Sequence, residues 1–308
     1  LEQINDAALL RPKAMIDEVE DAYRAHLRNI ARNIVSHYGT AKVCMLAGPS
    51  SSGKTTTAHL LRDYLAALGL KAEIVSLDDF YLGVEQMPVL PSGERDYETV
   101  NALDIELVRA CIRSVIDRGA CMLPAYDFTT SERRLNARKL DLRGNGFVIM
   151  EGIHALNPIF TKDLPEGSAI KLYVSVKQQI KDANGEVISP MDLRLIRRIA
   201  RDVQFRNTSA ERTLSMWPNV VAGEDKYIRP YRMSADYTVN SIHIYEPCVL
   251  RSSVIPLLRR IPEDSPHYRK ARDLDARLMR FEPVEPGLVP ENSMLREFLG
   301  PKAEKRAE

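Results

Sequence analysis

The sequence predicts an α/β protein in three layers, with a mainly parallel sheet, helices on both faces and a helical, arginine-rich lid. Three observations support this prediction. Short apolar runs of strand length alternate with amphipathic stretches of helix length, which is typical of βαβ units. A glycine-rich motif at residues 48–55 joins the first apolar run to the helix that follows it. Four arginines between residues 194 and 201 recur at helical spacing, so they share one face of a helix.

The individual elements follow from periodicity and from the residues that end each run. Asp104 is a typical helix N-cap, and Gly69 and Gly119 follow the last turns of two helices. Proline and glycine between residues 80 and 96 predict a loop. The expected strands are residues 42–47, 72–77, 147–150, 170–176 and 235–240. The expected helices are residues 12–38, 55–68, 104–118, 190–221 and 247–261.

The chain divides into three parts in this prediction. Residues 1–39 form a helical lead-in, residues 40–261 form the α/β domain with its lid at about 186–221, and residues 262–308 form a proline-rich extension. Because the extension contains six prolines and ends in charged residues, we expect it to be extended, wrapped on the surface or frayed.

Composition excludes several classes of protein. The 308 residues include 43 Lys and Arg against 42 Asp and Glu, and a formal net charge of +1 does not suit a polycation that coats nucleic acid. No run approaches the roughly 20 apolar residues of a membrane span. The four cysteines stand apart, which favours a reducing compartment. We therefore expect a soluble, cytoplasmic protein without a membrane partner, trimmed or part of a longer chain because it begins with Leu.

Residues 48–55, Gly-Pro-Ser-Ser-Ser-Gly-Lys-Thr, match the P-loop pattern G-x-x-x-x-G-K-[ST]. In such a loop, consecutive backbone N–H groups face phosphate oxygens, and the dipole of the following helix adds to the attraction. Gly53 allows close approach, Lys54 reaches the β- and γ-phosphates, and the Thr55 hydroxyl ligates Mg²⁺. The fold is therefore expected to be of the P-loop NTPase type. The expected nucleotide-binding residues of the loop are Gly48, Pro49, Ser50, Ser51, Ser52, Gly53, Lys54, Thr55 and Thr56.

Carboxylates follow two of the expected strands. Asp78 and Asp79 come after the second strand, and Glu151 ends the strand that begins at Phe147. Asp78 in this position can accept the proton of an attacking hydroxyl, which makes it a candidate general base. Lys54 is a second candidate catalytic residue. Glu151 and Asp78 can hold Mg²⁺ together with Thr55. The alternative is that these acids are turn or helix-cap residues.

The arginine cluster consists of Arg194, Arg197, Arg198 and Arg201. Stacked guanidiniums repel one another unless anions neutralise them, and their planar forks suit phosphate oxygens. Beside a P-loop, this pattern favours a mobile lid that closes over the transferred phosphate. A solvated basic face and a nucleic-acid surface are the alternatives, and nucleic acid is the less favoured partner.

Taken in order, the motifs G-P-S-S-S-G-K-T, D-D-F-Y, D-Y-E, A-Y-D-F, E-G and R-L-I-R-R-I-A-R-D resemble those of the uridine kinase and phosphoribulokinase family over about residues 40–245. The resemblance implies that Asp78 is the general base and that Thr55 and Glu151 help to hold Mg²⁺. It also implies substrate-binding roles for Tyr81, Glu98, Tyr126, Phe128 and Arg194. Arg197, as a catalytic residue, and Arg201, as an ATP-binding residue, are implied to contact phosphates.

The sequence therefore predicts ATP- and Mg²⁺-dependent phosphoryl transfer to a hydroxyl of a small acceptor, with a nucleoside as the first candidate. Ser131 stands where uridine kinases carry a base-reading His, and Glu98 stands where they usually carry Asp. The alternatives are another sugar-like or polyol acceptor, and a nucleotide-regulated RNA-binding module. Homo-oligomer formation is left open. The two ends of the chain also resemble a bacterial subgroup in which the kinase follows domains like those of threonyl-tRNA synthetase.

Overall fold

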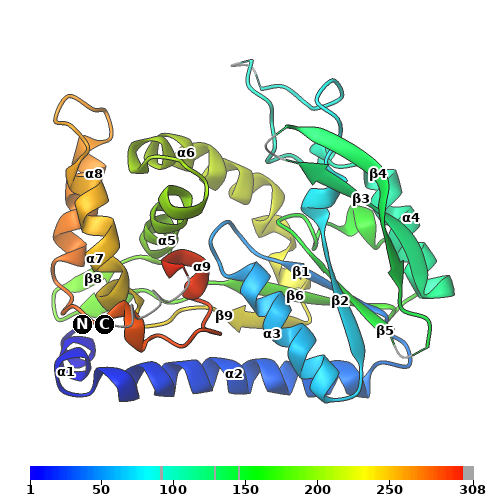
Figure 1. The fold of residues 1–308 in the computed structure, drawn as a ribbon, viewed down its shortest axis with the longest axis horizontal. Helices are drawn as coiled ribbons and strands as arrows, with labels where there is room; N and C mark the ends of the chain where they lie inside the picture. Colours follow the sequence, from blue (N-terminus) through cyan, green and yellow to red (C-terminus); the bar gives the residue numbers. More distant parts are fainter. Residues whose placement is uncertain (91–92, 128–129, 145, 301–308) are drawn as a thin grey trace, which may run out of the picture.

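Five parallel strands form the central sheet of this computed structural model, in the order β2-β5-β1-β6-β9 (Figure 1). The structure describes residues 1–90, 93–127, 130–144 and 146–300. The strands are β1 (Val43–Ala47), β2 (Lys71–Ser76), β5 (Gly146–Glu151), β6 (Ala169–Ser175) and β9 (Tyr237–Asn240). The parallel sheet predicted from the sequence is confirmed.

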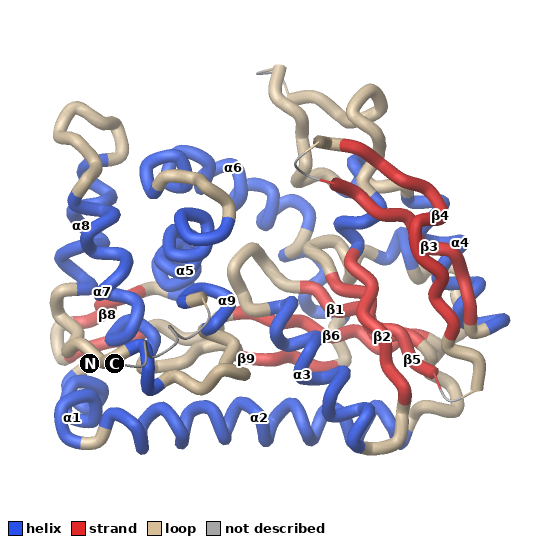
Figure 2. Tube along the Cα trace, viewed as in Figure 1, coloured by secondary structure: helices blue, strands red, loops and turns tan. Residues whose placement is uncertain are grey.

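Helices cover both faces of this sheet, so the three-layer prediction is also confirmed (Figures 1 and 2). In β1, Cys44 and Leu46 pack into the larger apolar cluster, while Val43, Met45 and Ala47 pack into the smaller one on the opposite face. The helices are α1 (Glu2–Leu10), α2 (Pro12–Ser36), α3 (Lys54–Ala67), α4 (Ile105–Arg118), α5 (Pro190–Phe205), α6 (Ala210–Tyr227), α7 (Glu246–Arg259), α8 (Tyr268–Leu278) and α9 (Arg296–Leu299). Of these helices, which the described residues form, none is both long and apolar enough to cross a bilayer.

Local signals explain why the helix ends agree with the sequence. The Asp104 side chain accepts a hydrogen bond from the backbone N–H of Leu107 and begins α4. Gly119 ends the same helix in the left-handed conformation, with φ of 67°. The arginine-rich stretch forms two helices, because the chain turns at Asn207 and the Ser209 side chain caps α6.

Two antiparallel hairpins add to the elements that the sequence predicts. One pairs β3 (Ala120–Asp127) with β4 (Glu132–Asp141), and the other pairs β7 (Ile180–Asp182) with β8 (Gly185–Ile188). The first hairpin flanks the sheet on the side of α4 (Figure 2). Most side chains of β4 are exposed and several are charged, so this strand has little apolar alternation for a sequence pattern to detect.

The expectation that the chain beyond residue 262 is extended or frayed is wrong for the described part. Helix α8 occupies a proline-free stretch and buries Ala271, Leu274 and Leu278. Further along, apolar side chains enter the larger cluster, including Phe281, Val284, Val289, Met294, Leu295 and Phe298. The prolines of the described part lie at the bends between these packed pieces, where they do not prevent burial.

Candidate active site

A tight backbone turn joins β1 to α3 and forms the P-loop, residues 48–55. A β-carbon on Gly48 would lie 2.1 Å from the carbonyl oxygen of Val174, so only glycine fits where the loop leaves the sheet. Gly53 precedes α3 with φ of 84°, in the left-handed region that favours glycine. These two glycines shape a turn at the positive end of α3, which is a place where anions bind.

A cavity of about 1020 Å³ lies over this turn. The loop residues that line it are Ser50, Ser51, Ser52, Gly53, Lys54 and Thr55. The acids and cations that line it from other elements include Asp78, Glu98, Glu151, Arg198 and Arg201. A cavity of this size accommodates a nucleotide together with a small acceptor. The P-loop and the acids singled out in the sequence therefore meet at one place.

Asp78 and Glu151 come together because β2 and β5 are adjacent and parallel. Ser76 at the end of β2 lies opposite Glu151, and its hydroxyl donates a hydrogen bond to the Glu151 carboxylate over 3.1 Å. The same hydroxyl accepts a hydrogen bond from the backbone N–H of Asp78, at 3.3 Å, and begins the 3₁₀ turn Leu77–Phe80. One serine side chain thus positions both acids at the edge of the sheet.

Desolvation shifts the titration of the three charged groups nearest the loop. Burial lowers the pKa of the Lys54 amine, and the carboxylates of Glu151, Glu297 and Asp78 oppose this shift. Burial raises the pKa of Glu151 to about 6, against the opposing charge of Lys54. Asp78 is open to the cavity, yet the protein that surrounds it desolvates the carboxyl and raises its pKa. The pKa of each of these groups therefore depends on the charges of the others.

Aromatic rings line the cavity together with Glu98. Tyr81 and Tyr97 line the cavity with Glu98, and the Tyr81 hydroxyl donates a hydrogen bond to the Tyr97 carbonyl over 2.9 Å. Tyr126 packs behind Tyr81, with 5.5 Å between the ring centroids. Phe128 lies outside the described residues. Of the three rings expected around the acceptor, the structure thus places Tyr81 in the wall and Tyr126 in a layer behind it.

Glu98 is held close to α6 and to a buried histidine. A β-carbon on Gly223 would lie 2.9 Å from the Glu98 β-carbon, so this glycine allows the helix to approach. Burial raises the pKa of Glu98, and the charge of Arg198 opposes the shift. His154 packs edge-on against Tyr227, and burial lowers its pKa to about 4, so the ring is neutral at pH 7. These contacts favour a packing role for His154.

Arg197 lies behind the P-loop, where it holds the loop backbone. Its guanidinium donates to the carbonyl of Ser51 over 3.2 Å and to the carbonyl of Ser241 over 2.7 Å. It also forms a two-point ion pair with Glu246, and none of its side chain is exposed to solvent. The sequence analysis expects Arg197 to reach phosphate, whereas the structure encloses it among protein groups.

Arg194 is the second arginine that contacts the loop from behind. Its Nε donates to the carbonyl of Ser50 over 3.0 Å, and its Nη2 pairs with Glu224 over 2.7 Å. Arg194 and Glu224 line a separate cavity of about 480 Å³, together with Pro49. Arg194 is therefore not among the residues that line the larger cavity with Glu98, with which the sequence analysis groups it. Arg198 and Arg201, one and two turns further along the same face of α5, line the larger cavity instead.

Several residues of the cavity are absent from the sequence-based set. Glu297 lines it from α9 and accepts a hydrogen bond from the Thr56 hydroxyl over 3.3 Å. Phe205, Arg206 and Asn207 line it from the bend between α5 and α6. Arg206 continues the run of arginines on α5 and could have been found from that pattern, whereas nothing in the local sequence around Glu297 indicates the site.

The oxygen donors of Thr55, Asp78 and Glu151 fit a magnesium ion. The Thr55 hydroxyl, Glu151 and Asp78 line the same cavity, and Mg²⁺ prefers hard oxygen ligands of this kind. Among the described residues, no group of three or more His, Cys, Asp or Glu side chains could hold a metal by itself. Mg²⁺ usually binds through one or two carboxylates and the phosphates of the substrate.

Comparison with known proteins places the chain in a family. A sequence model of the phosphoribulokinase / uridine kinase family matches residues 43–246, which is more than half of the 308 residues. The chain belongs to this family. As a member of the phosphoribulokinase and uridine kinase family, it is an ATP-dependent kinase, and the resemblance of the sequence to this family is confirmed.

The chain is also similar to curated relatives and to solved structures. The chain is 28% identical over 198 residues to a uridine kinase of Ureaplasma parvum, which covers 63% of this chain and 86% of the relative. It is 29% identical over 198 residues to a uridine kinase of Lactobacillus johnsonii, covering 63% and 83% of the two chains. The solved structure of a possible uridine kinase from Bacillus stearothermophilus has a TM-score of 0.47 and 15% identity, covering 70% of this chain and 97% of that one.

Proposed function

We propose that the kinase transfers the γ-phosphoryl group of ATP to a hydroxyl of a nucleoside-like acceptor. The observation that carries this proposal is the shared cavity, in which Lys54 of the P-loop and Asp78 lie together with Glu98 and Tyr81. The P-loop suits the triphosphate. The carboxylate of Glu98 suits the hydroxyls of a sugar because it accepts hydrogen bonds.

The chemistry follows from the positions of the charged groups. Asp78 accepts the proton of the acceptor hydroxyl, whose oxygen then forms a bond to the γ-phosphorus. The bond from that phosphorus to the bridging oxygen breaks, and ADP leaves with the electron pair. The raised pKa of Asp78 makes it a stronger base than a fully solvated carboxylate. Lys54 stabilises the negative charge on the transferred group.

Magnesium binding falls to Thr55, Glu151 and Asp78 in this proposal. When bound with ATP, the ion neutralises the charge of the phosphate oxygens. Arg198 and Arg201, which line the cavity from α5, add positive charge to it and exclude water.

Two observations favour a nucleoside over a free sugar or polyol acceptor. Tyr81 and Tyr97 place aromatic rings in the cavity wall, and such rings suit the face of a nucleobase. The curated relatives named above are uridine kinases. A binding module without turnover, the remaining alternative, has no use for an acid that faces the lysine of a P-loop.

An acceptor panel tests the proposal. ADP release from ATP and Mg²⁺ is measured without an acceptor and with nucleosides, ribose and glycerol, each at millimolar concentration. We expect one or more nucleosides to raise the rate at least tenfold over the rate without acceptor. Stimulation by ribose or glycerol alone would replace the nucleoside by a polyol, and the absence of any stimulation would refute small-molecule transfer.

A further inference from the structure

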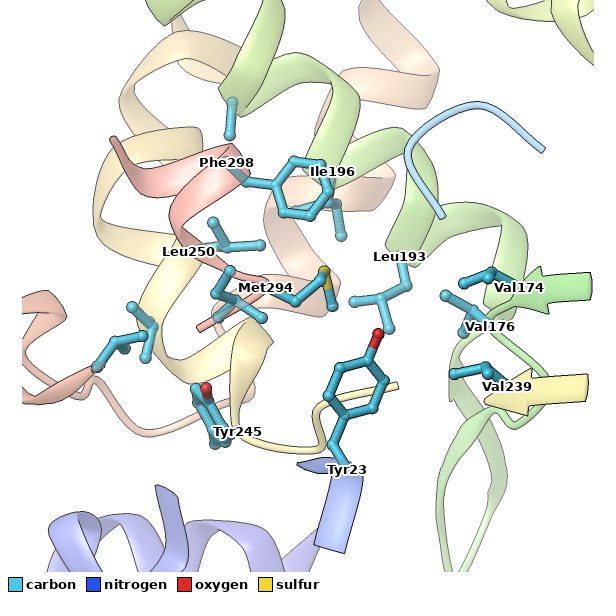
Figure 3. Packing of buried hydrophobic residues seen from close by; sticks show 14 of the residues in the cluster. Tyr23, Val174, Val176, Leu193, Ile196, Val239, Tyr245, Leu250, Met294 and Phe298 are labelled. Atoms are coloured by element: carbon cyan, nitrogen blue, oxygen red, sulfur yellow. The ribbon is translucent and has the colours of Figure 1, made fainter. Parts of the chain in front are cut away.

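Residues 290–299, which we call the strap, cross the site on the side of the P-loop. The strap lies outside the part of the chain that matches the family, which ends at residue 246, and it includes α9. In Figure 1, α9 lies between α5 and the turn that leads into α3. Figure 3 shows Met294 and Phe298 pointing into the packed region beside Ile196 of α5. A segment with no counterpart in the family match therefore forms part of the wall of the active site.

Apolar contacts fix the strap against the loop. Met294 and Phe298 are buried, with 0% and 1% of their surface exposed. A β-carbon on Gly53 would lie 2.7 Å from Cγ of Met294, so the thioether rests directly on the P-loop. The ring of Phe298 covers the guanidinium of Arg197, with 5.3 Å between the guanidinium carbon and the ring centroid. The strap thus covers Arg197, which the sequence analysis expects to contact a phosphate.

Glu297 brings a negative charge to the start of α3. Its carboxylate accepts the hydrogen bond from Thr56, in the first turn of the helix, and it lines the same cavity as Lys54 and Thr55. This turn carries unpaired backbone N–H groups and the positive end of the helix dipole, so it stabilises an anion. The carboxylate of Glu297 lies beside this turn, where it accepts the hydrogen bond from the Thr56 hydroxyl.

A bound triphosphate needs the same turn. P-loop N–H groups and the first turn of the following helix hold the α- and β-phosphates. A carboxylate and a phosphate side by side repel each other, and the repulsion is stronger in a partly desolvated cavity than in water. Desolvation around Lys54 and Glu151 shows that this cavity is such an environment.

We propose that the strap is an autoinhibitory contact, in which Glu297 holds the place of a phosphate beside Thr56 and ATP must displace it. The inference rests on ATP as the donor in the proposed function, and it does not depend on the identity of the acceptor. Displacement of the strap would also uncover Arg197 by removing Phe298 from its guanidinium.

The test compares Glu297→Gln with Glu291→Gln. The first change removes the charge and keeps a side-chain oxygen for the Thr56 hydroxyl. The second removes an exposed charge on the same strap and serves as the matched control. Equilibrium binding of ATP and of inorganic tripolyphosphate is measured without acceptor. We expect Glu297→Gln to bind both ligands about tenfold more tightly than the wild type, and Glu291→Gln to stay within twofold.

Amide hydrogen exchange gives a second readout that does not rely on a substitution. We expect saturating ATP to accelerate exchange at residues 293–299 of the wild type, because the strap leaves the loop. Unchanged or weaker ATP binding by Glu297→Gln, or slower exchange of the strap with ATP, would overturn the inference and make Glu297 a fixed part of the donor site. Failure of every nucleoside as an acceptor would refute the proposed acceptor and leave this result standing. If neither the wild type nor Glu297→Gln binds ATP, the proposed donor site and the inference are both overturned.

Discussion

The hydroxyl of Ser76 donates a hydrogen bond to the carboxylate of Glu151 across the paired ends of β2 and β5, over 3.1 Å. The same oxygen accepts a hydrogen bond from the backbone N–H of Asp78. The register of two parallel strands thereby sets the spacing between the proposed metal ligand and the proposed base. The arrangement depends on local pairing within the sheet and therefore belongs to the fold itself.

Ser76→Ala is expected to change the pH dependence of the reaction. The pKa of Glu151 is raised to about 6, so kcat/KM for ATP should fall as the pH drops through about 6 and the carboxylate becomes protonated. The hydrogen bond from Ser76 favours the charged form, so its removal should shift this acid limb to higher pH by about one unit. The measurement is a pH profile of kcat/KM for both proteins. An acid limb at the same pH in both would contradict this role of Ser76.

Glu151→Gln is expected to stabilise the ligand-free protein while it abolishes activity. The folded-state pKa of Glu151 lies above its ordinary value, so its contribution to stability is present at low pH and is lost as the pH rises through about 6. The neutral amide removes this cost and should add about 2 kcal/mol to the free energy of unfolding at pH 8 and little at pH 4. Urea unfolding at the two pH values checks this. A loss of stability at pH 8 would show that the charge of Glu151 is already compensated.

Arg197→Ala is expected to act mainly through stability. The change leaves Glu246 buried without its partner, and breaking a buried ion pair costs about 3–5 kcal/mol. Denaturant unfolding should show this loss, whereas Arg201→Ala, in the cavity wall, should reduce activity with little effect on unfolding. Should Arg197→Ala retain full stability and still lose activity, the arginine would have a direct role at the phosphates, as the sequence analysis expects.

Uridine is expected to be a poor acceptor. Ser131 replaces the base-reading His that the family resemblance places there, and a short hydroxyl cannot make the contacts of an imidazole. We expect kcat/KM for uridine to lie at least tenfold below that of the best nucleoside, and Ser131→His to narrow the gap. Efficient phosphorylation of uridine by the unaltered enzyme would show that other side chains read the base.

Local signals explain how much of this structure could be predicted. The glycines at 48 and 53, the cap at Asp104 and the apolar strands each act over a few residues, so the sheet, its helices and the P-loop follow from sequence. The neighbouring positions of Asp78 and Glu151 also follow, because the strands that carry them are parallel.

Long-range partners explain what could not be predicted. Arg197 forms an ion pair with Glu246, which lies 49 positions away in the sequence. This partner holds the guanidinium behind the P-loop, where it contacts the loop backbone. Glu297 reaches Thr56 from 241 positions away. The many prolines near Phe298 also conceal the apolar residues of the strap, so the sequence suggests a loose tail where the structure has a packed wall.

The measurement that bears most strongly on Asp78 as the base compares Asp78→Asn with Asp79→Asn. Asp79 is the adjacent acid, half-buried in the same 3₁₀ turn, and is the matched control. With the best acceptor of the panel, Asp78→Asn should lower kcat by about 10²–10⁴ and leave the Kd for ATP within twofold, while Asp79→Asn stays within about threefold of the wild type. A kcat for Asp78→Asn close to that of the wild type would contradict the proposed chemistry.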